Sequence, residues 1–338
     1  MIATQNQDGA RLAMSTVAEI LSKAVEDGVA AGLAVAWLRG DGSARTAAGG
    51  TLGAGDDAPM RADSVFWIAS MSKAVTATAA LQLVEQGKLE LDAPVGRLLP
   101  ALADPLVITG FDAEGRAQTR PARSPITLRH LLGHTSGLGY DFCSDVLMRN
   151  QTSPAPVGDP VLLFDPGEGW QYGVGLDWTG QLVEAASGAP FADFVRANIT
   201  GPLGMQDTTF FPGEAFAGRA AAMHARLPDG GLAKIPFGLP PEPYPAMGGG
   251  GLYSTPLDYV KFLRAMLKGG GGLLSPQTVA LMFAPLASGP HVGVLRSTNP
   301  AMSNDFDAFP DMSKSWGLAF MRNDAPGPAG RSAGSHAW

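Results

Sequence analysis

One mostly apolar stretch, from Ser64 to Val84, contains a single charged side chain, Lys73. Its Ala, Met, Leu and Gln residues favour a helix, and Gly87 supplies a natural stop just beyond it. A helix that begins near Ser70 places Ser70 and Lys73 on one face, within reach of each other. Ser70 would then lie at the positive end of the helix dipole, where negative charge that develops on oxygen is stabilised.

Two other interpretations of this stretch are open. About twenty mostly apolar residues could span a membrane. A central lysine would cost about 2.5–3.5 kcal/mol there, and the flanking Asp63 and Glu85 are acidic. The helix could also belong to the core, with its lysine simply reaching solvent at the helix start. The S-x-x-K pattern is short and occurs by chance, so spacing alone does not separate a core helix from a catalytic pair.

The catalytic interpretation depends on the burial of Lys73. An ammonium buried among apolar neighbours loses hydration, and its pKa then falls by up to about 3–5 units. A neutral amine near pH 7 could take the proton of the Ser70 hydroxyl and make that oxygen a nucleophile. No neighbour in the sequence would pair with the charge of Lys73.

The remaining patterns place strands at both ends of the chain and helices between them. Strands are expected at 31–39 and 43–49, joined by a glycine turn, and again at 316–321 and 334–338. Helices are expected at 16–27, 91–100, 126–137, 175–186, 190–199, 255–267 and 275–282, with a loop or lid at 146–166 and a proline-rich irregular segment at 236–245.

This order of elements predicts an α/β (α+β) fold. An antiparallel sheet built from the two termini is flanked by helices, and a large helical region is inserted. We expect residues 1–100 and 262–338 to form the sheet region and residues 101–261 to be mainly helical, as one domain overall.

Composition narrows the class of protein. Hydrophobic residues make up 45% of the 338 residues and charged residues 16%, which is typical of a globular chain. The net charge of −7 argues against nucleic acid or an anionic membrane as a partner. The single cysteine, Cys143, excludes an internal disulfide and has no cationic neighbour that would activate it. The N-terminal residues lack a secretory signal, so a cytoplasmic protein is expected.

Other kinds of site find little support. The chain has no G-x-S-x-G sequence, so the nucleophile elbow of the α/β-hydrolases is absent. His130 and His134 are four residues apart but lack the glutamate of H-E-x-x-H, so a structural role at a helix end is expected. The glycine runs at 248–251 and 269–272 lack the Gly-Lys-Ser/Thr of a phosphate loop. Neither a metal nor a cofactor is expected.

Several longer motifs occur in a characteristic order. They are Trp67-Ile-Ala-Ser70-Met-Ser-Lys73, Leu131-Leu-Gly-His-Thr-Ser-Gly-Leu138, Phe164-Asp-Pro-Gly-Glu-Gly-Trp170-Gln-Tyr172, Pro202-Leu-Gly-Met-Gln-Asp-Thr208 and Gly248-Gly-Gly-Gly-Leu-Tyr-Ser-Thr255-Pro-Leu-Asp-Tyr259. With them the chain resembles, from about Val17 to its last residue, the serine β-lactamase and penicillin-binding-protein superfamily. It is most similar to the class C-like branch of carboxylesterases, the family VIII esterases.

The resemblance implies a β-lactamase/transpeptidase-like fold and a set of catalytic residues. Ser70 matches the acylated nucleophile and Lys73 its partner base. Tyr172 matches the tyrosine that shares the proton transfer and protonates the leaving group. A phenolate close to a lysine ammonium is favoured by the opposite charge.

Departures from the superfamily's motifs bear on the substrate. Val174 stands where Asn or Ser usually orients an amide, and its side chain has neither donor nor acceptor. Trp338 aligns with the Lys or His that helps bind a substrate carboxylate, as in the related esterases. It would be a substrate-binding residue with a flat apolar wall and one N–H. Both changes point to uncharged esters.

In the family that the chain resembles, the sequence continues beyond the position of Trp338 with glycines, a strand and a helix. A backbone N–H just past this tryptophan normally joins that of Ser70 in the oxyanion hole, and losing one such donor costs about 10²–10³ in rate. A sheet without its last strand would expose an edge. The sequence is therefore either a fragment of a longer protein or a shortened form with impaired chemistry, and we expect the fragment.

The function expected from these residues is a serine carboxylesterase that cleaves short-chain or aryl esters through an acyl-enzyme on Ser70. Its expected partner is a small-molecule ester, and the sequence does not indicate an oligomeric state. Alternatives with the same chemistry are an acyltransferase or a hydrolase of β-lactams or small amides. A non-catalytic penicillin-binding-like module, which acylates slowly or only binds, is a further alternative.

Overall fold

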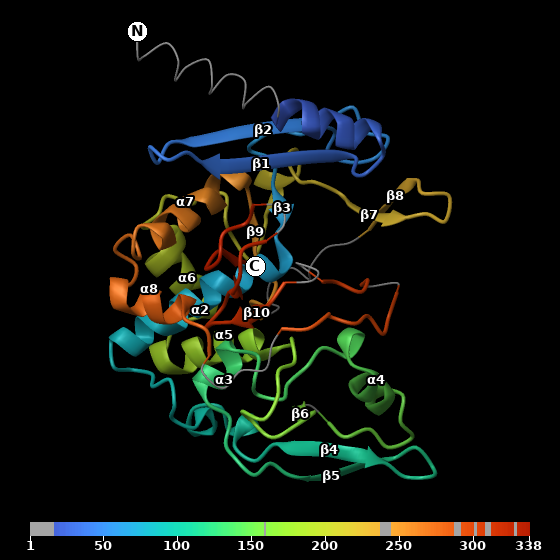
Figure 1. Ribbon diagram of the computed structural model, residues 1–338, viewed down its shortest axis with the longest axis vertical. Coiled ribbons are helices and arrows are strands. Elements are labelled where there is room, and N and C mark those ends of the chain that lie inside the picture. Colours follow the sequence, from blue (N-terminus) through green and yellow to red (C-terminus); the bar gives the residue numbers. More distant parts are fainter. Residues whose placement is uncertain are drawn as a thin grey trace. The chain divides into compact units, whose positions relative to one another are not determined.

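The computed structural model describes residues 17–158, 160–236, 245–286, 292–300, 303–307, 312–327 and 330–338. The chain forms two compact units, each made of helices and small sheets (Figure 1). Unit 1 comprises residues 1–69, 200–245 and 251–268, and unit 2 comprises residues 70–199, 246–250 and 269–338. The mixed α/β class agrees with the sequence prediction, and the predicted division of the chain at residues 100 and 262 remains a prediction.

Unit 1 contains the predicted N-terminal hairpin. Strands β1 (Gly32–Leu38) and β2 (Ala44–Gly50) pair antiparallel, with Val35 opposite Ala47. The preceding helix covers residues 17–26 and ends before Gly28, whose φ is +68°; Thr16, its predicted cap, lies outside the described residues. Helix α7 (Pro256–Leu267) packs on β1. As predicted, it begins at a capping threonine, because the side chain of Thr255 accepts a hydrogen bond from the N–H of Asp258.

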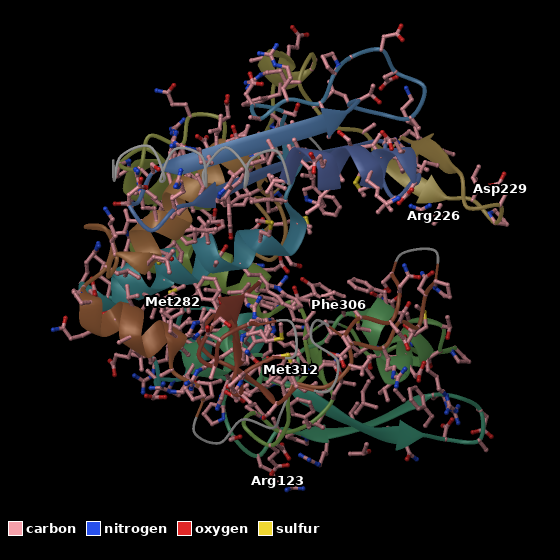
Figure 2. All side chains as sticks on the ribbon, turned by 45° about the horizontal axis from the view of Figure 1, so that its top comes forward. Arg123, Arg226, Asp229, Met282, Phe306 and Met312 are labelled. Atoms are coloured by element: carbon pink, nitrogen blue, oxygen red, sulfur yellow. The ribbon has the colours of Figure 1, made fainter. Side chains whose placement is uncertain are left out.

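Short strand pairs complete unit 1. Strand β3 (Phe66–Trp67) pairs with β9 (Tyr253–Ser254), and β7 (Met223–Arg226) pairs with β8 (Leu232–Ile235). Figure 2 shows Arg226 and Asp229 on the β7–β8 hairpin. A 3₁₀ turn, η6, spans Glu214–Phe216. None of the four strands β3, β7, β8 and β9 was predicted from the sequence.

Unit 2 is organised around α2 (Ser72–Glu85). A 3₁₀ turn, η1 (Ala69–Met71), precedes it, so helical structure begins near Ser70 as predicted, and Gly87 follows the end with φ +69°. Every residue from Ser72 to Leu83 is buried, as expected for a helix that has apolar residues on all its faces. Helices α5 (Gly175–Ser187) and α6 (Phe191–Val195) pack against α2. In the described part of the chain, none of the helices is long and apolar enough to cross a membrane.

Other elements of unit 2 differ from the predicted ones in extent or type. The predicted helix at 91–100 consists of the 3₁₀ turns η2 (Val95–Arg97) and η3 (Pro100–Leu102). Helix α3 (Leu128–Leu132) is shorter than predicted, with Thr127 as its cap and Gly133 at its end. The predicted helix at 190–199 is α6 followed by a π-helical turn, η5 (Arg196–Thr200). Most of the proline-rich segment, residues 237–244, lies outside the described residues.

The loop predicted at 146–166 is wrong over part of its length. Another turn, η4 (Asp141–Cys143), leads into helix α4 (Asp145–Gln151), and Ser144 caps that helix by accepting from the N–H of Leu147. Strand β6 (Val161–Leu162) pairs in parallel with β4 (Leu106–Phe111), which also pairs with β5 (Ala117–Pro121). These elements form because Leu147 and Val161 bury their side chains with Ile108 in a common cluster.

The C-terminal strands form a sheet of their own. After α8 (Pro276–Phe283), strands β10 (Lys314–Trp316), β11 (Met321–Asn323) and β12 (His336–Ala337) pair antiparallel. The predicted strand at 316–321 is interrupted, because Trp316 pairs with Met321 and the residues between them form a turn in which the N–H of Gly317 donates to the carbonyl of Phe320 at 2.8 Å. In the described residues, the strands of the two termini therefore belong to separate sheets and not to the single sheet expected.

Candidate active site

Ser70 lies in the turn that leads into α2. The residue before it, Ala69, has a φ of +45°, a left-handed conformation that is uncommon outside glycine. The Ser70 side chain is partly buried. Its backbone N–H lies at the N-terminal end of the helical segment, where the helix dipole favours negative charge.

Lys73 lies one turn further along, in the first turn of α2, and is completely buried. Its Nζ donates hydrogen bonds to Ser70 Oγ at 3.1 Å, to the hydroxyl of Tyr140 at 3.1 Å and to the carbonyl of Gly249 at 2.6 Å. Loss of hydration lowers the pKa of Lys73 to about 7, against the opposing charge of Asp177. A lysine that simply reaches solvent, the second alternative for this helix, is thereby excluded.

Tyr172 lies in the segment before α5 and is buried. Its ring centroid is 4.7 Å from Lys73 Nζ, and its hydroxyl is hydrogen-bonded to Ser70. Burial raises the pKa of Tyr172, while the hydrogen bonds with Ser70 and Trp338 lower it. The structure therefore brings the predicted Ser70, Lys73 and Tyr172 into mutual contact.

Trp338 contacts Tyr172 directly. Its Nε1 donates a hydrogen bond to the Tyr172 hydroxyl at 2.9 Å, and the ring centroids are 4.9 Å apart. Trp316 and Phe306 flank the indole, at centroid distances of 5.0 Å and 6.1 Å; Phe306 is labelled in Figure 2. The predicted role of Trp338 in substrate binding remains a prediction, and its hydrogen bond to Tyr172 was not foreseen.

Two further residues of the site, Tyr140 and Asp177, were not predicted from the sequence. The Tyr140 hydroxyl is hydrogen-bonded to the carboxylate of Asp177, which also accepts from the N–H of Gly249 at 2.8 Å. Burial raises the pKa of Asp177, and the charge of Lys73 lowers it. Burial also raises the pKa of Tyr140 well above its usual value. The one sequence signal was the glycine run at 248–251, which belongs to one of the family motifs but was given no role at the site.

Small residues hold the Tyr172 segment close to its neighbours. A side chain at Gly173 would meet the Cα of Gly139 at 2.5 Å, and one at Gly175 would meet the carbonyl of Leu131 at 2.6 Å. Val174 is the cap residue of α5 and forms no side-chain capping hydrogen bond. The backbone geometry around Tyr172 therefore depends on glycine at these positions.

The two histidines have structural contacts. His130 forms a capping box with Thr127 at the start of α3. His134 is buried with a φ of +58°, and its Nδ1 accepts from the N–H of Gly173 at 3.4 Å. Burial and the nearby Lys73 charge lower the pKa of His134, which keeps its ring neutral. Among the described residues, no group of three or more His, Cys, Asp or Glu side chains could hold a metal ion.

Comparisons with known proteins place this geometry in a family. The Beta-lactamase family model matches residues 17–338. Monacolin J acid methylbutanoyltransferase of Aspergillus terreus is 40% identical over 243 residues, 67% of this chain and 58% of that protein. Lovastatin esterase of Penicillium rubens is 38% identical over 268 residues, 73% of this chain and 67% of that protein.

A solved structure gives the same result. Unliganded simvastatin synthase from Aspergillus terreus matches with a TM-score of 0.78 at 32% identity, over 92% of this chain and 82% of that one. The chain spans 58% of the length of the methylbutanoyltransferase. The superfamily that the motifs predicted is confirmed, whereas the relatives' names include transferases as well as an esterase and do not single out the carboxylesterase branch. The chain belongs to the beta-lactamase family.

Proposed function

We propose that the protein is a serine-dependent carboxylesterase that forms an acyl-enzyme on Ser70. The observation that carries this proposal is the contact of 3.1 Å between Ser70 Oγ and a completely buried lysine amine whose pKa is about 7. At neutral pH a large fraction of such an amine is unprotonated, which makes it a base for a serine hydroxyl.

The reaction begins when Lys73 accepts the Ser70 proton and Ser70 Oγ bonds to the ester carbonyl carbon. The carbonyl oxygen becomes an oxyanion, which the backbone N–H of Ser70 stabilises at the N-terminal end of the helical segment. Tyr172, in contact with both Ser70 and Lys73, gives its proton to the departing alkoxide and recovers one from Lys73. The C–O bond of the ester breaks, and the acyl group stays on Ser70.

A water molecule completes the turnover. It gives a proton to Lys73, which became neutral when Tyr172 recovered its own proton, and attacks the acyl carbon. Ser70 then leaves with that proton, returned by Lys73. The products are a carboxylic acid and an alcohol. The Trp338 N–H supports the Tyr172 oxygen whenever it carries negative charge, because a donor to a phenolate lowers its free energy.

The substrate that fits these surroundings is an uncharged ester with an apolar acyl or alcohol part. The ring of Tyr140 stacks on Phe142 at a centroid distance of 4.8 Å, and Phe306 lies beside Trp338. Neither Val174 nor Trp338 supplies a cation or an amide partner. Short-chain and aryl esters are therefore the first substrates to test.

A second candidate function is acyl transfer to an alcohol. Two similar proteins bear the names monacolin J acid methylbutanoyltransferase and simvastatin synthase. The chemistry on Ser70 is the same, and an alcohol replaces water as the nucleophile that removes the acyl group. Adding increasing concentrations of an apolar alcohol to a reaction with an activated ester separates the two. Hydrolysis predominates in an esterase, and the new ester predominates in a transferase.

The direct test is hydrolysis of p-nitrophenyl esters by the full-length protein, its Ser70→Ala variant and a matched Ser72→Ala control. We expect turnover by the wild type and by Ser72→Ala, and a loss of about 10³-fold or more in Ser70→Ala. Equal rates for wild type and Ser70→Ala would end the proposal. Nitrocefin turnover that exceeds ester turnover would replace the esterase with a β-lactamase, and a single burst without turnover would indicate a binding module.

A further inference from the structure

We propose that Asp177 is a positioning residue for the base: together with Tyr140 and the peptide of Gly249, it aims the Lys73 amine at Ser70 and sets the pH range in which that amine accepts a proton. This inference rests on the proposed function, because it assigns Lys73 the role of base. It concerns a carboxylate that the reaction as described above does not use.

The contacts form a closed ring of hydrogen bonds. Asp177 accepts from the N–H of Gly249 at 2.8 Å, and the carbonyl of the same Gly249 accepts from Lys73 Nζ at 2.6 Å. Lys73 Nζ also contacts the Tyr140 hydroxyl at 3.1 Å, and that hydroxyl is hydrogen-bonded to Asp177. Asp177 therefore reaches Lys73 along two routes, one through a peptide group and one through a phenol.

The ring fixes the amine because its members have little freedom. A side chain at Gly249 would lie 2.3 Å from Asp177 Oδ2, so only glycine allows this approach. The neighbouring carbonyl, that of Gly248, accepts from the hydroxyl of Thr76 at 2.7 Å, which anchors the glycine run to α2. With two acceptors of the Lys73 ammonium held in this way, its remaining N–H points to Ser70 Oγ.

The ring also provides the electrostatic balance at Lys73. The titratable groups that face the amine are Tyr140 and His134 from the segments after α3, Tyr172 before α5, and Asp177 on α5 itself. His134 is neutral and both phenols keep their protons, so Asp177 is the negative charge that opposes the desolvation of Lys73. A base has to release its proton again in the second half of each step, and a pKa near the working pH serves both directions.

The variant that tests the charge is Asp177→Asn. Its amide oxygen can still accept from Gly249, whereas its negative charge is gone. We expect the pKa of Lys73 to fall, because an opposite charge no longer stabilises the ammonium. The acid limb of the kcat/KM profile, centred near pH 7 in the wild type, then moves to lower pH, and kcat on the plateau falls while KM changes little. Asp177→Glu, which restores the charge, moves the limb back towards that of the wild type.

Tyr140→Phe tests the second route and decides the matter if Asp177→Asn does not fold. It removes the hydroxyl from the ring and keeps the stacking on Phe142. A weaker set of acceptors again lowers the pKa of Lys73, so the acid limb moves in the same direction. The matched control is Asp165→Asn, which removes another buried carboxylate, one paired with Arg120. We expect the acid limb of this variant to lie at the same pH as in the wild type.

The readout is the pH dependence of p-nitrophenyl ester turnover and of the rate at which a phosphonate labels Ser70, with folding checked by circular dichroism. The inference is overturned if the Asp177→Asn variant folds and the acid limb of its pH profile lies at the same pH as in the wild type. If Asp177→Asn does not fold, the same result in folded Tyr140→Phe overturns it. The Ser70→Ala variant separates this result from failure of the proposed function. If it turns over like the wild type, the acyl-enzyme itself is wrong, whatever Asp177 does.

Discussion

Among the described residues of unit 2, two lysines are buried, and their surroundings differ. Lys314, on β10, forms an ion pair with the carboxylate of Asp307. Lys73, on α2, donates to a hydroxyl, a phenol and a peptide carbonyl, all of them neutral, and the carboxylate of Asp177 lies one partner further away. One lysine therefore has its counter-ion in direct contact and the other does not.

This difference separates a structural cation from a candidate base. A buried ammonium that contacts a carboxylate forms an ion pair with it. Removing one residue of this pair leaves the charge of the other buried and uncompensated. A buried ammonium with neutral acceptors has lost its hydration without a counter-ion to replace it, so its pKa falls. Lys73 is thus distinguished from Lys314 by the chemical nature of its hydrogen-bond acceptors, and not by burial alone.

The largest expected effect is the loss of activity when the side chain of Lys73 is replaced. Lys73→Met removes the base, and we expect kcat/KM for p-nitrophenyl esters to fall by about 10²–10⁴. Lys314→Met leaves kcat/KM within a few-fold of wild type. It destabilises the fold by up to about 3 kcal/mol, because Asp307 loses its cation. Steady-state kinetics and thermal unfolding measure both variants, and a similar loss of kcat/KM in the two would remove the distinction.

The second effect is the pH dependence of the wild type. Lys73 acts as a base only when it is neutral, and its pKa is about 7. Turnover should therefore be constant above that pH and fall about tenfold per pH unit below it. The measurement is kcat/KM between pH 5 and pH 9, with substrate stability checked in the Ser70→Ala variant. A flat profile across this range would be incompatible with Lys73 as the titrating base.

A third prediction concerns the indole of Trp338, which lies next to Tyr172. Trp338→Phe removes the N–H that donates to the Tyr172 oxygen, and we expect kcat to fall about twofold to tenfold, the value of one hydrogen bond. Since this donor lowers the pKa of Tyr172, any basic limb moves to higher pH. Trp316→Phe is the control, because its indole donates to the carbonyl of Leu132 in the same aromatic cluster. If the two variants lose the same activity, packing explains the loss.

The smallest expected effect is on stability at low pH. Hydrogen bonds from Arg120 and from the N–H of Arg123 hold the pKa of Asp165 at about 2. A carboxyl with a lowered pKa stabilises the fold above its unfolded pKa, and this contribution is lost as the pH falls towards 2. The melting temperature of Asp165→Asn should thus lie below that of wild type at pH 6 and approach it near pH 2. A difference that is constant with pH would show that this charge is not responsible.

The sequence predicted the parts of the site that are local. Ser70 and Lys73 share one helical turn, so spacing and composition were enough to pair them, and the motif around Trp170 identified Tyr172 by resemblance. The capping threonines of α3 and α7 were likewise evident, since a cap depends on the residues that follow it. Capping residues are thus accessible from the sequence alone, whereas the full extent of a helix is not, as the short α3 shows.

The missed features depend on contacts between distant residues. Asp177 reaches Lys73 through Gly249, across 72 residues of chain, and no pattern near Asp177 indicates a buried carboxylate. Strand β6 consists of Val161 and Leu162 and is defined by its pairing with β4. Such a short run carries no periodicity of its own. The separation of the terminal strands into two sheets was not predicted for the same reason, because hydrophobic patterns predict strands but not which strands pair.

The most direct test of the central claim is an NMR titration of the Lys73 side chain in protein labelled at lysine Cε, with the signal assigned by its loss in Lys73→Arg. We predict a midpoint near pH 7, well separated from those of the exposed lysines. A midpoint near 10.5, the ordinary value for a lysine, would contradict the account, because the amine would then be charged at neutral pH and unable to take the proton of Ser70.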